Sequence, residues 1–97
     1  MFARVTTVAV QPDHVADVTR IYNESILPAV KAAAGNHGVY LLINPASGKG
    51  VSITLWENQA DGDTYDSSGT YRQLVSMIAQ YFAAPPSLDT YELAAQG

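Results

Sequence analysis

Hydrophobic and polar positions divide the chain into four strand-like and two helix-like segments. Residues 2–10, FARVTTVAV, are rich in β-branched side chains and end at a Gln-Pro-Asp turn, so they are predicted to form a strand. Asp13 suits a helix N-cap, because its carboxylate can accept hydrogen bonds from the first free amides. The apolar positions that follow have the spacing of an amphipathic helix: Val15, Val18, Tyr22, Ile26, Ala29 and Ala33. Pro28 lacks a backbone donor and crowds the carbonyl of Glu24, so we expect a kink or a break near Leu27.

The middle of the chain, residues 38–57, is predicted to form a β-hairpin. Residues 39–43, VYLLI, are apolar at every position, which is typical of a strand that is covered on both faces. The next seven residues, NPASGKG, have the composition of a turn, and residues 51–57 follow as the second strand.

The last third of the chain predicts a helix and a final strand. Asn58 can cap a short helical stretch directly after it, which Asp61-Gly62-Asp63 is expected to interrupt. A better helix opens at Gly69-Thr70, and its apolar side consists of Tyr71, Leu74, Val75, Ile78, Tyr81 and Phe82. Pro85-Pro86 are expected to stop this helix, and residues 87–94 to form the last strand.

The order of elements is strand, helix, strand, strand, helix, strand, which predicts one α+β domain over residues 1–97. This is the ferredoxin-like βαββαβ arrangement, with two helices on one face of a four-stranded antiparallel sheet. Its other sheet face is bare. Because VYLLI is apolar on both faces, we expect a second copy of the chain to cover that face, giving a homodimer.

Composition narrows the classes of function. The 97 residues carry a net charge of -4, with five basic residues spread along the chain, so no basic patch for nucleic acid is expected. The chain lacks cysteine, which excludes disulfides and cysteine zinc sites. The amino terminus resembles neither a signal peptide nor a membrane span, so the prediction is a cytoplasmic protein without a membrane partner.

The single tryptophan lies on a strand face of unusual composition. In the segment SITLWEN, Ile53 and Leu55 alternate with Ser52, Thr54 and Trp56, so the two sets point to opposite faces. A buried ring in a core or interface is the commonest place for a tryptophan. Serine and threonine, however, are too small to fill the space under two helices, which predicts a void beside the ring and a small-molecule pocket.

Neither histidine has the spacing of a metal site. His37 lies at a strand start between glycines, where a surface position is more usual than a catalytic base. His14 falls in the first helical turn, where the helix dipole disfavours a positive charge. No metal is expected. Arg4 and Arg72 can neutralise the negative charge of a bound ligand such as a phenolate, although arginine is more commonly found on the surface.

Three features together resemble the antibiotic-biosynthesis-monooxygenase-like (ABM) family over essentially the whole chain. They are the element order, the G-x-x-G of Gly35 and Gly38 before an apolar strand, and the segment SITLWE leading into a helix. The resemblance implies a dimeric α/β barrel in which bare sheet faces meet. It also implies a pocket between sheet and helices, lined by a strand tryptophan that Trp56 matches. Family members have an asparagine four residues earlier, where this chain has Ser52.

Members of this family that oxidise aromatic polyketides or quinols use neither metal nor flavin, so the resemblance implies an oxygenase without a cofactor. Haem-degrading members carry a histidine on the second helix, and residues 70–82 contain none, so haem is poorly supported. The candidate substrate-binding residues are Trp56, Ser52, Thr54, Tyr22, Tyr65, Tyr71 and His37, among which Trp56, Ser52 and Tyr71 are the catalytic candidates. The alternative is a homodimeric small-ligand-binding or accessory protein that uses the same cavity without turnover.

Overall fold

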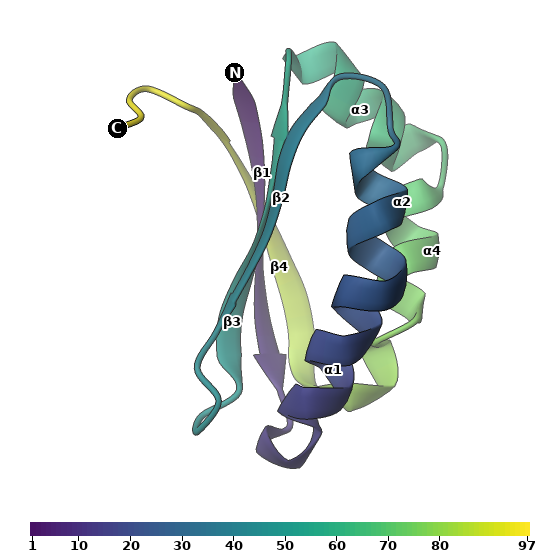
Figure 1. Ribbon diagram of the computed structural model, residues 1–97, viewed down its shortest axis with the longest axis vertical. Helices are drawn as coiled ribbons and strands as arrows, with labels where there is room; N and C mark the ends of the chain where they lie inside the picture. Colours follow the sequence, from purple (N-terminus) through teal and green to yellow (C-terminus); the bar gives the residue numbers. More distant parts are fainter.

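A computed structural model describes residues 1–97 and has the predicted α+β ferredoxin-like fold (Figure 1). The strands are β1 (Phe2–Val10), β2 (Asn36–Ile43), β3 (Lys49–Trp56) and β4 (Phe82–Glu92). They pair antiparallel in the spatial order β2-β3-β1-β4, so β2 and β4 are the edges. All the helices lie on one side of this sheet (Figure 1). None of them is both long enough and apolar enough to span a bilayer.

The first helical segment is continuous but changes its winding. It consists of η1 (Pro12–His14), α1 (Val15–Ile21), η2 (Tyr22–Ile26) and α2 (Leu27–Lys31). The irregularity expected near Leu27 is present as the π-helical turn η2, directly before the helix that contains Pro28. The predicted N-cap is wrong: Asp13 lies inside η1, and the residue before α1 is His14, whose side chain forms no cap bond.

The second helical segment begins as predicted but differs from its prediction in the middle and at its end. It consists of α3 (Gln59–Ser67), α4 (Thr70–Ser76) and the short 3-10 turn η3 (Ala79–Tyr81). Asn58 caps α3 as predicted, since its side chain accepts a hydrogen bond from the Asp61 amide at 3.1 Å. Asp61-Gly62-Asp63 do not interrupt the helix. Gly62 has a packing role instead, because a Cβ there would lie 2.9 Å from the Phe2 ring.

The last strand is longer than predicted and contains the two prolines. β4 begins at Phe82 rather than at residue 87, so Pro85 and Pro86 lie within it. A proline cannot donate to a strand ladder, but β4 is an edge strand and its pairing with β1 shifts register between Thr7 and Ala9. Edge strands and bulges are where sheets accept proline.

The two faces of the sheet have different environments. Trp56, Val8 and Val10 face the helices and belong to the buried core. Strand β2 alternates, as Val39, Leu41 and Ile43 pack against that core, whereas Tyr40 and Leu42 point the other way and are 49% and 54% exposed. VYLLI is therefore covered on only one face within a single chain.

Candidate functional site

A cavity lies between the sheet and the helices, as the sequence predicts. Its volume is about 40 Å³. The lining residues are mainly apolar and come from β1, the first helix, β2, β3, α3, α4 and β4: Thr6, Val8, Val18, Tyr22, Ile26, Leu41, Ser52, Tyr65, Tyr71, Leu74, Val75, Ile78, Phe82 and Pro86. Four predicted site residues are thus brought together: Tyr22, Ser52, Tyr65 and Tyr71.

The polar groups of the cavity are hydroxyls. Tyr22 and Ser52 share a hydrogen bond of 2.7 Å between their oxygens, and the Tyr22 hydroxyl also donates to the Tyr40 carbonyl at 3.3 Å. On the opposite side, the hydroxyls of Thr6 and Tyr71 lie 3.4 Å apart. Tyr22 opens the π-helical turn, so the change in winding is located where the helix presents this hydroxyl to β3.

Burial raises the pKa of two cavity phenols, Tyr22 and Tyr65. Desolvation raises the pKa of Tyr22, although the hydrogen bond from Ser52 opposes the shift. Desolvation also raises the pKa of Tyr65, and here the nearby positive charge of Arg4 is the opposing effect. At neutral pH both phenols are therefore hydrogen-bond donors, and neither is a general base.

Trp56 lies behind the cavity rather than beside it. Its side chain is 0% exposed, and the indole Nε1 donates to Thr54 Oγ1 at 2.9 Å. Its ring packs against Tyr65, with centroids 4.9 Å apart, and Tyr65 is the residue that lines the cavity. The predicted void beside Trp56 is therefore wrong, because a ring from α3 fills that space. Thr54 satisfies the indole and likewise does not line the cavity.

Both histidines are on the surface. His37, at the start of β2, is exposed and its Nε2 pairs with the Glu57 carboxylate, outside the cavity. His14 Nδ1 pairs with Asp17 at 2.9 Å. No cluster of three or more histidine, aspartate or glutamate side chains has the arrangement of a metal site.

Arg4 is the functional candidate that sequence reasoning undervalued. It is only 4% exposed, faces the helices from β1, and pairs with Asp66 through Nη1 at 3.4 Å. Its Nε and Nη2 atoms are buried and have no hydrogen-bond partner. An unsatisfied buried donor costs about 1–3 kcal/mol, and more when it is charged. The alternation of FARVTTVAV, which puts Arg4 on the same face as Val8 and Val10, was the available signal.

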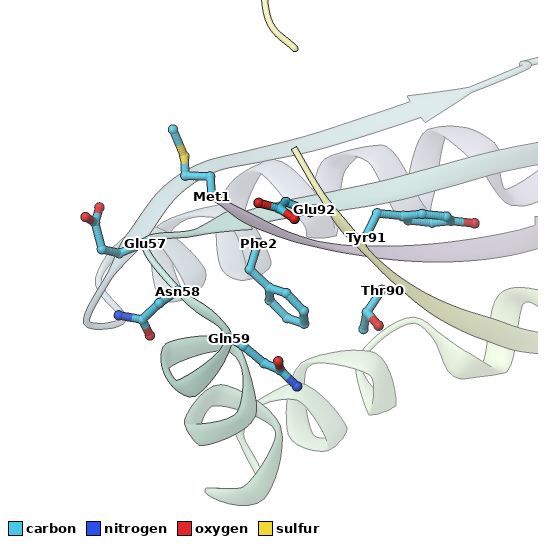
Figure 2. A pocket seen from close by; sticks show the side chains of 8 residues that line it. All are labelled: Met1, Phe2, Glu57, Asn58, Gln59, Thr90, Tyr91 and Glu92. Carbon is cyan, nitrogen blue, oxygen red and sulfur yellow. The ribbon is translucent and has the colours of Figure 1, made fainter. Parts of the chain in front are cut away.

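A second hollow lies at the end of the sheet (Figure 2). Its volume is about 470 Å³, and it is lined by Met1, Phe2, Glu57, Asn58, Gln59, Thr90, Tyr91 and Glu92. Figure 2 shows Glu57 and Glu92 at separate places around the hollow, and Glu57 is already paired with His37. The hollow shares no residue with the internal cavity, and none of the paired hydroxyls of Thr6, Tyr22, Ser52 and Tyr71 lines it. The internal cavity is therefore the better candidate site.

The bond between Tyr22 and Ser52 gives a first testable prediction. We expect Tyr22→Phe to lower the free energy of unfolding by about 1 kcal/mol, because the half-buried Ser52 hydroxyl loses its partner. The melting temperature should fall by about 4–8 °C in a domain of this size. Tyr81→Phe is the matched control, since the Tyr81 hydroxyl forms no hydrogen bond and its ring packs on His14 outside the cavity. Equal melting temperatures for the two variants would show that the bond contributes nothing.

Comparisons with known proteins give one family. A sequence model of the antibiotic biosynthesis monooxygenases matches residues 1–77, from β1 to the end of α4. No curated protein matches the sequence. A solved structure from Bordetella bronchiseptica that carries the family's name is 21% identical, with a TM-score of 0.82 and 97% coverage of each chain.

Two further solved structures share the fold. A Nitrosomonas europaea protein that carries the same family name is 14% identical, with a TM-score of 0.81 over 98% of this chain and 100% of that one. A monooxygenase from the gene ActVA-Orf6 of Streptomyces coelicolor, in complex with the ligand nanaomycin D, is 12% identical. Its TM-score is 0.82, over 98% of this chain and 88% of that chain.

Proposed function

The chain belongs to the antibiotic biosynthesis monooxygenase family, and from that premise we propose that it is a cofactor-independent monooxygenase. Its substrate is a small aromatic or quinol-type molecule that binds between the sheet and the helices. The observation that carries this proposal is the cavity, which has apolar walls and four hydroxyls from Thr6, Tyr22, Ser52 and Tyr71 facing each other in pairs.

This reaction requires few charged groups from the protein. The ionised substrate passes an electron to O₂, one oxygen atom is added to a ring carbon, and the other leaves as water with two substrate hydrogens. The protein contributes exclusion of water and orientation by hydrogen bonds. Protonated Tyr22 and Tyr65 suit this role, because a neutral phenol can donate to a substrate oxygen.

The cavity must enlarge before an aromatic ring enters. Small-molecule pockets measure roughly 300–1,000 Å³, whereas this one is about 40 Å³. Tyr71 is the residue whose movement enlarges it most directly. It also lines an open outer hollow of about 560 Å³, together with Asp63, Asp66, Ser67, Gly69 and Arg72. Tyr71 therefore separates the internal cavity from solvent, on a helix of only seven residues.

A non-catalytic ligand-binding protein is the second candidate function. The observation that favours it is that the cavity hydroxyls bond to one another, Tyr22 to Ser52 and Thr6 to Tyr71. Ser52 also stands where the family pattern noted above has an asparagine. Such a protein would bind the same aromatic class without consuming oxygen.

Oxygen consumption separates these two candidates. With anthrone or dihydroxynaphthalene, we expect uptake by the wild type and a loss of about tenfold to a hundredfold in kcat/KM for Tyr71→Phe, since a positioned donor is removed. Tyr81→Phe is the control, because Tyr81 packs on His14 and does not line the cavity. Saturable binding without any uptake across these substrates would favour the second candidate.

We also propose that the protein is a homodimer whose copies meet through the bare sheet face. The supporting observation is that the apolar side chains of that face are at least partly exposed in the single chain: Val5, Tyr40, Leu42, Val51 and Ile53. Figure 1 shows no helix on that side of the sheet. Large contiguous apolar patches on soluble proteins usually mark interaction surfaces.

A further inference from the structure

Arg4 is a buried cation whose charge the protein only partly balances. Its one ion pair is with Asp66, whose carboxylate is 51% exposed and lies 3.4 Å from Nη1. That distance is long for a charge-assisted hydrogen bond, which is normally about 2.7–2.9 Å. Buried positive charges in proteins are normally paired and fully hydrogen-bonded. Arg4 departs from this rule.

The side chains around Arg4 leave one edge of its guanidinium unused. Thr54 on β3 and Thr90 on β4 are its neighbours in the sheet. The guanidinium carbon lies 5.6 Å from the ring centre of Tyr65 and 4.9 Å from that of Tyr71. These rings stabilise the charge through their faces, but neither phenol bonds to Nε or Nη2. Asp66 is the only carboxylate within ion-pair distance.

The two unpartnered atoms lie on the same edge of the guanidinium group. Nε and Nη2 form one side of the guanidinium fork, and their N–H bonds point in nearly parallel directions. Such an edge matches two oxygen atoms held side by side in a plane, as in a carboxylate or in two neighbouring oxygens on a ring. A single oxygen satisfies this edge less well.

We propose that Arg4 binds the ionised oxygen pair of an aromatic ligand, with Nε and Nη2 donating to two adjacent oxygens. The inference rests on the proposed function in taking the ligand to be aromatic, and it adds that the ligand binds as an oxyanion with a second oxygen next to the first. Arg4 itself does not line the internal cavity, but the rings of Tyr65 and Tyr71 line it and pack on Arg4, so a movement of these rings would bring the ligand to the guanidinium. Tyr71 and Asp66 both border the outer hollow, which gives the ligand a route past Tyr71.

Equilibrium binding of a chromophoric catechol tests this assignment without turnover. The probe is 4-nitrocatechol, which ionises near neutral pH with a change in its visible spectrum, and it is compared with 4-nitrophenol and with the neutral dimethyl ether of the catechol. We expect the wild type to bind the catechol monoanion about tenfold more tightly than the nitrophenolate, and more tightly still than the ether.

Three variants separate charge from geometry. Arg4→Met should lose the preference for the ionised catechol, a weakening of roughly tenfold to a hundredfold, while binding of the neutral ether is retained. Arg4→Lys keeps the charge but not the fork, so it should bind the two anions equally. Arg20→Met is the control, because it removes the same charge from an exposed helix position that lies outside the cavity.

Each outcome decides the assignment. A wild type that binds catechol and ether equally, or that binds neither, overturns it even if Arg4→Met fails to fold. A folded Arg4→Met protein that keeps the full preference also overturns it. If the preference is present but no substrate is oxidised, Arg4 keeps its role and the oxygenase proposal alone fails. If the protein consumes oxygen but shows no preference for the ionised catechol, the oxygenase proposal stands and the assignment of Arg4 fails.

Discussion

Replacing Trp56 by alanine is expected to lower the free energy of unfolding by about 3–5 kcal/mol, the range for truncating a large aromatic core residue. The side chain is 0% exposed, its indole N–H bonds to Thr54, and its ring packs against Tyr65. Truncation therefore opens a cavity and leaves the buried Thr54 hydroxyl without its donor. Natural domains are stable by only about 5–15 kcal/mol, so the variant should be close to unfolding at room temperature.

Thermal and urea denaturation followed by circular dichroism measure this loss. At about 4–8 °C per kcal/mol, the melting temperature should fall by at least about 12 °C. Trp56→Phe is the matched variant, because it keeps most of the ring volume and removes the N–H, and its loss should be clearly smaller. If Trp56→Ala melted within a few degrees of the wild type while ligand binding was lost, Trp56 would belong to a pocket and not to the core.

Trp56 also shows which structural features the sequence alone can predict. Alternation along SITLWEN correctly assigned Ser52, Thr54 and Trp56 to the helix-facing side, because strand periodicity is a local property. What fills the space above them is not local. The Tyr65 ring arrives from α3 and occupies the room that the small side chains leave. A pattern of small and large residues therefore predicts a face, but not whether a void remains there.

The difference between local periodicity and packing by distant residues also explains why Tyr22 was predicted correctly and Arg4 was not. Sequence periodicity put Tyr22 on the inner side of the first helix, and the structure pairs it with Ser52. The burial of Arg4 depends on Asp66 and on rings of the second helical segment, more than sixty residues away for Asp66, so single-sequence reasoning gave it the surface position that arginine usually has.

Whether Pro85 and Pro86 can lie within a strand likewise depends on the order of the strands in the sheet. Two prolines end a helix in most contexts, and the segment before them had helical spacing. Only the strand order shows that β4 is an edge, where a missing backbone donor costs little. Fold class followed from the element order, whereas this boundary required knowledge of which strands are neighbours.

The bare sheet face leads to the second large expected effect. Leu42 is 54% exposed in the single chain, and its neighbours across the ladder and along the strand, Val51 and Tyr40, are also hydrophobic. Should this face meet a second copy, the exposed area of Leu42 becomes buried at the interface. A carboxylate introduced there would have to lose its water at the interface, and the nearest basic side chain, the exposed Lys49 in the same surface hollow, would have to lose its water too.

We therefore expect Leu42→Asp to convert a stable dimer into a monomer at micromolar concentration, since desolvating a carboxylate among apolar side chains costs several kcal/mol. Light scattering should give twice the 10.4 kDa chain mass for the wild type and the chain mass itself for the variant. Gln73→Asp, an exposed substitution on α4, introduces the same charge on the helix side and should remain dimeric. A wild type of 10.4 kDa would contradict the dimer outright, and a dimeric Leu42→Asp protein would mean that the copies meet elsewhere.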